Sequence, residues 1–206
     1  MFVRFTSIYC EDSRIDDAIT VLEEVDRPAV EAVAGHQGLR TLVDRRSAVL
    51  VAASYWDAPE FASDATLTQA RWAAADAAGG ELTTDTWEVV ARLHTRPPSA
   101  ATVLQMYCAS RVAESTALTA MMAGSTFPLL ATCTGMCQAE LMLDHETGAA
   151  FLATEWEDET QLRPEGIRQT RRLLDHVREE LGVEFNPIGA YRVVGESWRS
   201  VGHLRR

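Results

Sequence analysis

Two tryptophans and two arginines stand 100 residues apart in this chain and could do the same chemistry twice. Trp56 and Trp156 each end an apolar run, "AASYW" and "LATEW", and Arg71 and Arg171 follow fifteen residues later. A guanidinium can hold a phenolate or carboxylate through two parallel hydrogen bonds, and an indole can stack on an aromatic ring. The pairing indicates a pocket for a planar, acidic aromatic molecule.

Each of these residues also has a structural interpretation. Either tryptophan could close the end of a sheet as a core residue, because a large aromatic side chain buries much apolar area. Either arginine could lie at the rim of its helix and pair with a neighbouring carboxylate. The residue types alone leave both interpretations open.

One tyrosine ends the first expected strand of each half. Tyr9 lies on the same strand face as Ser7, and Tyr107 lies on the same strand face as Gln105. Such groups could deprotonate or orient a phenolic substrate, whose carbanion then reacts with oxygen. A tyrosine at a strand end could equally be a half-buried packing residue.

The second helices of the two halves differ in side-chain size. The first reads "RWAAADAAGG", whereas the second carries Leu173, Leu174, Val177 and Leu181 at the same places. We expect the small side chains to leave room for a ligand in the first half. The sequence therefore predicts Tyr9 and Arg71 as catalytic residues, and as ligand-binding residues Ser7, Trp56, Trp72, Tyr107, Trp156 and Arg171.

The positions that repeat extend beyond these pairs. The identities at a shift of 100 residues without a gap include seven in which Pro28, Gly35, Asp44, Ala53, Trp56, Gln69 and Arg71 fall on Pro128, Gly135, Asp144, Ala153, Trp156, Gln169 and Arg171. The order of expected elements agrees, since each half predicts strand, helix, strand, strand, helix, strand. Boundaries follow as a first repeat over 1–96, a Pro-Pro linker over 97–101, a second repeat over 102–195 and a tail over 196–206.

A βαββαβ unit is a ferredoxin-like motif in which helices cover one face of the sheet. The other face stays bare, and two such units can bury their bare faces against each other. The predicted fold class is α+β, with two tandem ferredoxin-like units packed sheet to sheet as an intramolecular dimeric α/β barrel.

Composition excludes several classes of function. The net charge of −11 argues against a nucleic acid or an anionic membrane as partner. All nineteen basic residues are arginine, so neither Schiff-base chemistry nor a P-loop lysine is available. Five scattered histidines and four cysteines give no metal-binding spacing, and no stretch is long and apolar enough to span a bilayer. We expect a cytoplasmic protein without a metal, with homo-oligomerisation left open.

An apolar strand that ends in tryptophan, followed by an acidic turn and a helix, resembles the dimeric α/β-barrel family typified by the antibiotic biosynthesis monooxygenases. The stretches that carry this resemblance are "AASYWDAPEF" and "LATEWEDETQ", with the order of the elements. The resemblance implies a pocket between each sheet and its helices, and relatives that oxidise polycyclic aromatic molecules without a cofactor, degrade haem or have no known activity. The haem-degrading relatives carry a histidine in the helix after the tryptophan, and Asp57 to Gly80 contain none.

Two functions of different classes remain open. The first is a cofactor-independent monooxygenase-like enzyme that acts on a small aromatic or quinone-like molecule. The second is a non-catalytic protein of the same fold that binds a small molecule or serves as a scaffold. Haem binding through a histidine such as His36 is a further alternative.

Overall fold

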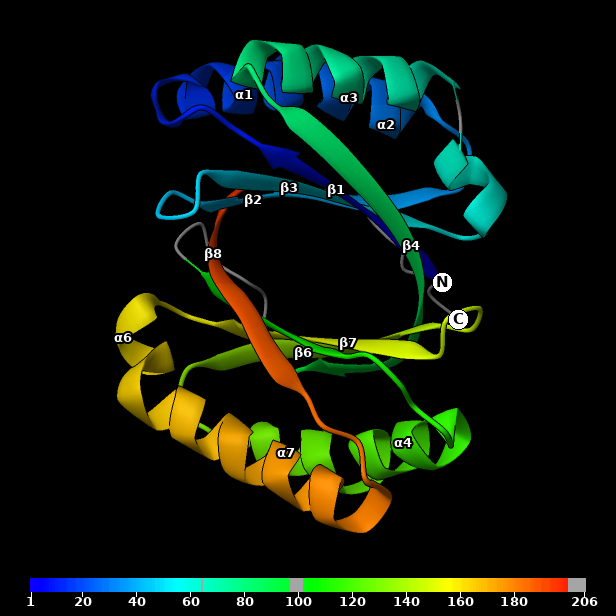
Figure 1. Ribbon diagram of the computed structural model, residues 1–206, viewed down its shortest axis with the longest axis vertical. Coiled ribbons are helices and arrows are strands. Elements are labelled where there is room, and N and C mark those ends of the chain that lie inside the picture. Colours follow the sequence, from blue (N-terminus) through cyan, green and yellow to red (C-terminus); the bar gives the residue numbers. More distant parts are fainter. Residues whose placement is uncertain (64, 97–101, 200–206) are drawn as a thin grey trace, which may run out of the picture. The chain divides into compact units, whose positions relative to one another are not determined.

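The computed structural model describes residues 1–63, 65–96 and 102–199, and in it helices cover one face of each sheet (Figure 1). The chain divides into two units. The first comprises Met1–Thr86 together with the described residues from Val194 onward, and the second is Trp87–Val193.

In the first unit, strand β3 (Val49–Trp56) pairs antiparallel with both β1 (Phe2–Tyr9) and β2 (His36–Asp44). Apolar residues at every second position face the helices, because successive side chains of a strand point to opposite faces. The helical segments are η1 (Asp12–Arg14), α1 (Ile15–Val21), η2 (Leu22–Asp26), α2 (Arg27–Ala32), η3 (Pro59–Ser63) and α3 (Ala65–Ala78).

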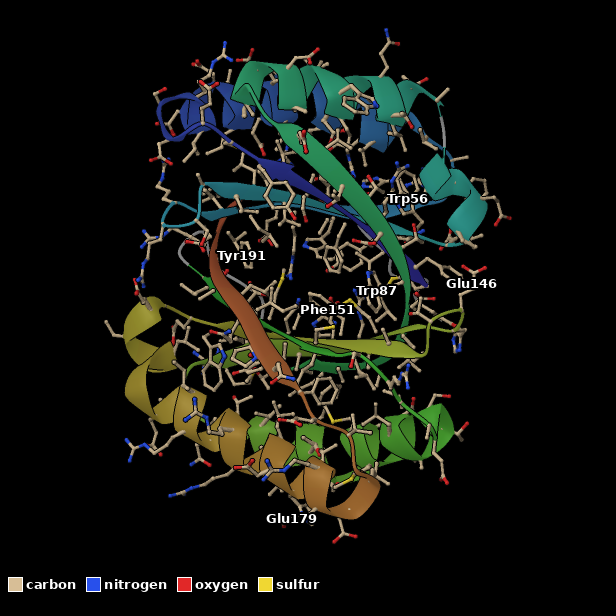
Figure 2. The ribbon with its side chains drawn as sticks, in the orientation of Figure 1. Trp56, Trp87, Glu146, Phe151, Glu179 and Tyr191 are labelled. Atoms are coloured by element: carbon tan, nitrogen blue, oxygen red, sulfur yellow. The ribbon has the colours of Figure 1, made fainter. Side chains whose placement is uncertain are left out.

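The second unit repeats this arrangement. Strand β7 (Ala149–Trp156) pairs with β5 (Val103–Ala109) and β6 (Met136–Asp144), and β8 (Asn186–Trp198) adds to β5. The part of β4 (Glu81–His94) that belongs to this unit pairs with β6, and its Trp87 ring lies against Phe151 with centroids 5.4 Å apart (Figure 2). The helical segments are α4 (Ser115–Met121), η4 (Met122–Thr126), α5 (Phe127–Leu130), α6 (Glu159–Gln161), η5 (Leu162–Gly166) and α7 (Ile167–Leu181).

Proline and glycine shape the first helical region of each half in the same way. A π-helical turn, η2, precedes α2, which begins with Pro28 in its first turn. In the second unit η4 and Pro128 repeat this arrangement. Proline lacks the amide hydrogen that an interior helix position must donate, so it is tolerated at a helix start. Gly35 and Gly135 follow with φ angles of 77° and 81°, a conformation that favours glycine.

Most elements of the two units are offset by 100 residues, but the first strands are not. Phe2 pairs with Trp56 and Val103 pairs with Trp156, so β5 corresponds to β1 with an offset of 101. Tyr107 therefore corresponds to Thr6. Tyr9 and Tyr107, which we expected at corresponding ends of the two first strands, are therefore three positions apart. A short apolar strand does not reveal its register by sequence alone.

The strands that end each half cross between the units. Most of β8 belongs to the second unit, yet its last residues belong to the first, and β4 begins in the first unit and ends in the second. The division between the units falls at Thr86 and Val193, inside the repeats expected over 1–96 and 102–195, because β4 and β8 each contribute residues to both units. Residues 196–198, expected as a tail, are part of β8, and the expected linker 97–101 lies outside the described residues.

The hydrogen-bonded strand order, β1-β3-β2-β8-β5-β7-β6-β4, is that of a closed eight-stranded antiparallel barrel. With helices between the strands, this is the expected α+β class. No helix in the described part of the chain has the length and apolar character that a membrane crossing requires.

Trp56 and Trp156 occupy corresponding buried places, each with no exposed area, as Figure 2 shows for Trp56 at the end of β3. The indole N–H of Trp56 donates to Ser54 Oγ over 3.0 Å, and that of Trp156 donates to Thr154 Oγ1 over 3.1 Å. Both rings are therefore core residues whose polar atom is satisfied locally.

We predict that Trp56→Ala and Trp156→Ala each lower the free energy of unfolding by about 3–5 kcal/mol, the usual cost of truncating a large buried aromatic residue. Urea titration followed by circular dichroism measures this cost. The exposed Trp72→Ala is the control and should change stability little. If the urea midpoints of Trp56→Ala and Trp156→Ala equal that of Trp72→Ala, the assignment of both tryptophans to the core is contradicted.

Candidate functional site

A cavity of about 300 Å³ opens in the second unit between α7, strand β5 and the start of β8. Its lining combines apolar and aromatic side chains with cations and carboxylates, as ligand pockets do. The lining residues are Gln105, Tyr107, Ile167, Arg171, Leu174, Asp175, Arg178, Glu184, Phe185 and Pro187. Among these described lining residues none is a histidine or a cysteine, so the cavity offers haem iron no such ligand.

Tyr107 forms part of the cavity wall from the helix-facing side of β5, and only 6% of it is exposed. Burial raises the pKa of Tyr107 to about 12, and the smaller effects of the Thr170 hydroxyl and the Arg171 guanidinium lower it. Desolvation disfavours the phenolate more than these two neighbours favour it. At neutral pH the phenol is therefore a hydrogen-bond donor to a guest rather than a base.

Arg171 projects from α7 at the cavity, with its side chain exposed to solvent. Among the described residues no carboxylate forms an ion pair with it. The nearby Arg178 is different, because its Nη2 lies 3.4 Å from Asp175 Oδ1. The guanidinium of Arg171 is therefore available to an anionic guest.

Gln105 lies two residues before Tyr107, on the same face of β5, and backbone carbonyl groups fix its side-chain amide. Its Nε2 donates to the carbonyl oxygen of Gly189 over 2.9 Å and to that of Met106 over 3.3 Å. Because both donors of the amide are engaged by carbonyl oxygens, its Oε1 is the group that can accept a hydrogen bond. The cavity thus combines one acceptor, the Tyr107 donor and the Arg171 cation.

In the first unit, the buried side chain of Arg71 occupies the corresponding space between α3 and the sheet. Arg71 is 2% exposed, and its Nε lies 3.0 Å from Asp26 Oδ1. Its Nη1 donates to Thr6 Oγ1 over 2.5 Å and its Nη2 donates to Ser54 Oγ over 3.0 Å. A buried guanidinium that is paired and hydrogen-bonded in this way holds the helix to the sheet and is not free to bind a ligand.

We expected the alanines of α3 to leave room for a ligand in the first half. Instead, these alanines pack in the core between α3 and the sheet. Ala74, Ala75 and Ala78 have no exposed area and belong to the same apolar cluster as Ile8 and Leu50. Small side chains let a helix approach its neighbours closely, and α3 packs directly on β1 and η2. In the second unit, the cavity lies between α7 and β5, and Ile167 and Leu174 of α7 are part of its lining.

Three other predicted residues of the first-half site do not meet Arg71. Tyr9 is 51% exposed, and it lies with Ser7 on the sheet face opposite to Thr6 and Ile8, which face the helices. Trp72 is 52% exposed on the outer side of α3, one position beyond Arg71. The structure thus separates Tyr9, Ser7 and Trp72 from the guanidinium that they were expected to assist.

Of the predicted second-half residues, the structure brings Tyr107 and Arg171 to one cavity and places Trp156 in the core beside Thr154. The sequence did not point to Glu184 and Phe185, which follow α7 after Gly182. It also did not point to Asp26, the partner of Arg71. The signal for Asp26 is its difference from the second half. A shift of 100 residues places the uncharged Thr126 at the position of Asp26, whereas the arginine is present in both halves.

His36 lies apart from this cavity and is 3% exposed, with its ring edge against the Trp56 ring at a centroid distance of 5.7 Å. Burial lowers its pKa, which keeps the ring neutral. No group of three His, Cys, Asp or Glu side chains placed to hold a metal ion occurs in residues 1–63, 65–96 and 102–199.

No family model matches the chain. Two uncharacterized proteins of Mycobacterium tuberculosis (strain ATCC 25618 / H37Rv) are similar in sequence. One is 29% identical over 154 residues, which cover 73% of this chain and 68% of that protein. The other is 25% identical over 209 residues, which cover 100% of this chain and 86% of that protein.

Solved structures show the same fold over nearly the whole chain. A protein of Fusobacterium nucleatum that is provisionally assigned as a monooxygenase superposes with a TM-score of 0.70 at 10% identity, covering 96% of this chain and 94% of its own. An anthrone oxidase-like protein gives a TM-score of 0.64 at 12% identity, covering 97% and 93%. At such identities the similarity establishes the fold alone, which is the ferredoxin-like α/β barrel that the sequence predicted.

The raised pKa of Tyr107 makes stability depend on alkaline pH. The folded pKa, about 12, exceeds the unfolded value of about 10, so the stabilisation is complete below pH 10 and is lost as pH rises toward 12. We predict that Tyr107→Phe removes this part of the decline, which amounts to about 3 kcal/mol at most. Urea midpoints between pH 9 and pH 12 measure it.

This pH range suits the measurement because the chain has no lysine to titrate there. Tyr9→Phe is the matched control, since the Tyr9 side chain is exposed. A Tyr107→Phe variant whose midpoint falls with pH as steeply as that of the control would contradict the buried, protonated phenol.

Proposed function

We propose that the second unit binds a small, planar, acidic aromatic molecule and oxidises it as a cofactor-independent monooxygenase-like enzyme. The observation that carries this proposal is the convergence of Arg171 and the protonated Tyr107 on one cavity that also has aromatic and aliphatic walls. A cation and a neutral donor together favour the anionic form of a phenol or of an enolisable ketone.

The apolar walls suit an aromatic ring. Phe185 can stack on it, and Ile167 and Leu174 supply further apolar surface. A cavity of about 300 Å³ lies at the lower end of the range for small-molecule pockets, which favours a guest of few rings.

The chemistry that this arrangement can support begins with loss of a proton from an activated ring CH₂. The carboxylates of Asp175 and Glu184 line the cavity and can receive that proton. Arg171 and Tyr107 stabilise the resulting enolate, which reduces O₂ and forms a C–OOH bond. Loss of water from the hydroperoxide leaves a ketone, so one oxygen atom enters the product and the other leaves as water.

The names of structurally similar proteins support this reaction class. One is provisionally assigned as a monooxygenase and another is described as anthrone oxidase-like. Anthrones have the activated ring CH₂ that the cavity groups could deprotonate.

Non-catalytic binding is the second candidate. It is favoured by the pKa of Tyr107, because a phenol that stays protonated to about pH 12 cannot act as the base. Only the carboxylates at the cavity remain for that role. Binding and turnover therefore need separate measurements.

We predict that Arg171→Ala weakens binding of 1-hydroxy-2-naphthoate roughly 10- to 100-fold, as loss of a charge-assisted hydrogen bond implies. Arg172→Ala removes the same charge from the next position of α7, outside the cavity lining, and should bind as the unaltered protein does. Isothermal titration calorimetry measures both affinities.

Equal affinities for Arg171→Ala and Arg172→Ala, or no binding by the unaltered protein, would contradict the proposed pocket. Oxygen uptake with 1,8-dihydroxyanthrone then separates the two candidates. Uptake above the uncatalysed rate that falls in Arg171→Ala supports the enzyme. Binding without such uptake supports the non-catalytic protein.

A further inference from the structure

The two units carry the same arginine in opposite states. Arg71 is buried and paired, whereas Arg171 is exposed at a cavity, although both occupy the same position of corresponding helices. The helix position therefore does not decide which state the guanidinium takes. The neighbours of the arginine on the sheet and on the first helical region must decide it.

In the first unit two neighbours hold the guanidinium inside. Asp26, the last residue of η2, has no exposed area and lies 3.0 Å from Arg71 Nε. Thr6 on β1 is short enough for Nη1 to reach its hydroxyl. One residue supplies the charge that a buried cation requires, and the other supplies the space and an acceptor.

In the second unit both neighbours have changed. Thr126 ends η4 where Asp26 ends η2; it is buried and carries no charge. Tyr107 stands at the register position of Thr6, so a phenol ring occupies the space beside the sheet that the guanidinium of Arg71 enters. An arginine here would lose its counter-ion and its space, and burial without a counter-ion is unfavourable.

We propose that Tyr107 and Thr126 are the positioning residues that keep Arg171 at the cavity. They do so by denying its guanidinium the buried site that Thr6 and Asp26 provide for Arg71. Tyr107 thus has two roles, as a donor to the guest and as a spacer. The chain has one open and one closed version of the same site, and two positions in each unit distinguish them.

This inference rests on the proposed function only in treating the cavity as the ligand site. Its test needs no ligand. Modification by 4-hydroxyphenylglyoxal, mapped by mass spectrometry of peptic peptides, reports the accessibility of each arginine. In the unaltered protein we expect Arg171 to react at a rate similar to that of its exposed neighbour Arg172, and Arg71 to resist modification.

The decisive variant carries the first-unit residues in the second unit, as Tyr107→Thr with Thr126→Asp. We expect the rate at Arg171 to fall at least tenfold relative to Arg172 in the same molecule, because the guanidinium gains a counter-ion and the space to reach it. Naphthoate affinity, measured in parallel, should fall as it does in Arg171→Ala.

Two control variants separate positioning from general disturbance. Tyr107→Phe keeps the ring, and Thr126→Val keeps the shape without a carboxylate, so both should leave Arg171 as reactive as in the unaltered protein. A loss of reactivity in either control overturns the inference. A folded double variant in which Arg171 reacts at the unaltered rate overturns it as well.

If the double variant does not fold, Asp26→Asn in the first unit decides, because it removes the counter-ion of Arg71 and keeps the shape of the side chain. Faster modification of Arg71 than in the unaltered protein supports the inference, and unchanged resistance of Arg71 overturns it. The proposed function can fail separately: a shift in modification without any naphthoate binding by the unaltered protein would retain the positioning role and remove the ligand.

Discussion

A guanidinium withdrawn from water must find a carboxylate and hydrogen-bond acceptors, and this requirement organises the first unit around Arg71. Asp26 supplies the charge, and Thr6 and Ser54 supply acceptors from two neighbouring strands. Ser54 also accepts the indole N–H of Trp56, so one polar cluster joins the helix, the sheet and the core tryptophan. Removal of either charged partner, Arg71 or Asp26, would leave the other charge buried without compensation, a cost of about 3–5 kcal/mol.

The second unit keeps the tryptophan and its hydroxyl partner but not the ion pair. Thr154 accepts from Trp156 as Ser54 does from Trp56, while Tyr107 and Thr126 replace the partners of the arginine. The consequence extends to packing: α3 lies on the sheet through alanines, whereas Leu174 and Tyr107 line a cavity beneath α7. One unit thus fills this place with a buried ion pair, and the other leaves a cavity there.

The order of elements and the fold class could be predicted from the sequence, because hydrophobic periodicity and the 100-residue repeat can both be read from it directly. The location of the pocket could not. Alanines were taken to leave space, but a helix is free to approach and close it, and the outcome depends on tertiary packing. The register of β1 was the second failure, since Tyr9 resembles Tyr107 in sequence yet lies on the other sheet face.

The central claim, that the ligand site lies in the second unit alone, is tested most directly by hydrogen–deuterium exchange with and without saturating 1-hydroxy-2-naphthoate. A bound guest should slow exchange in peptides from α7 (Ile167–Leu181) and from the segment around Glu184 and Phe185. Peptides from α3 (Ala65–Ala78) should be unchanged, because Arg71 and the alanines already fill that place. Protection of α3, with α7 unaffected, would contradict the account.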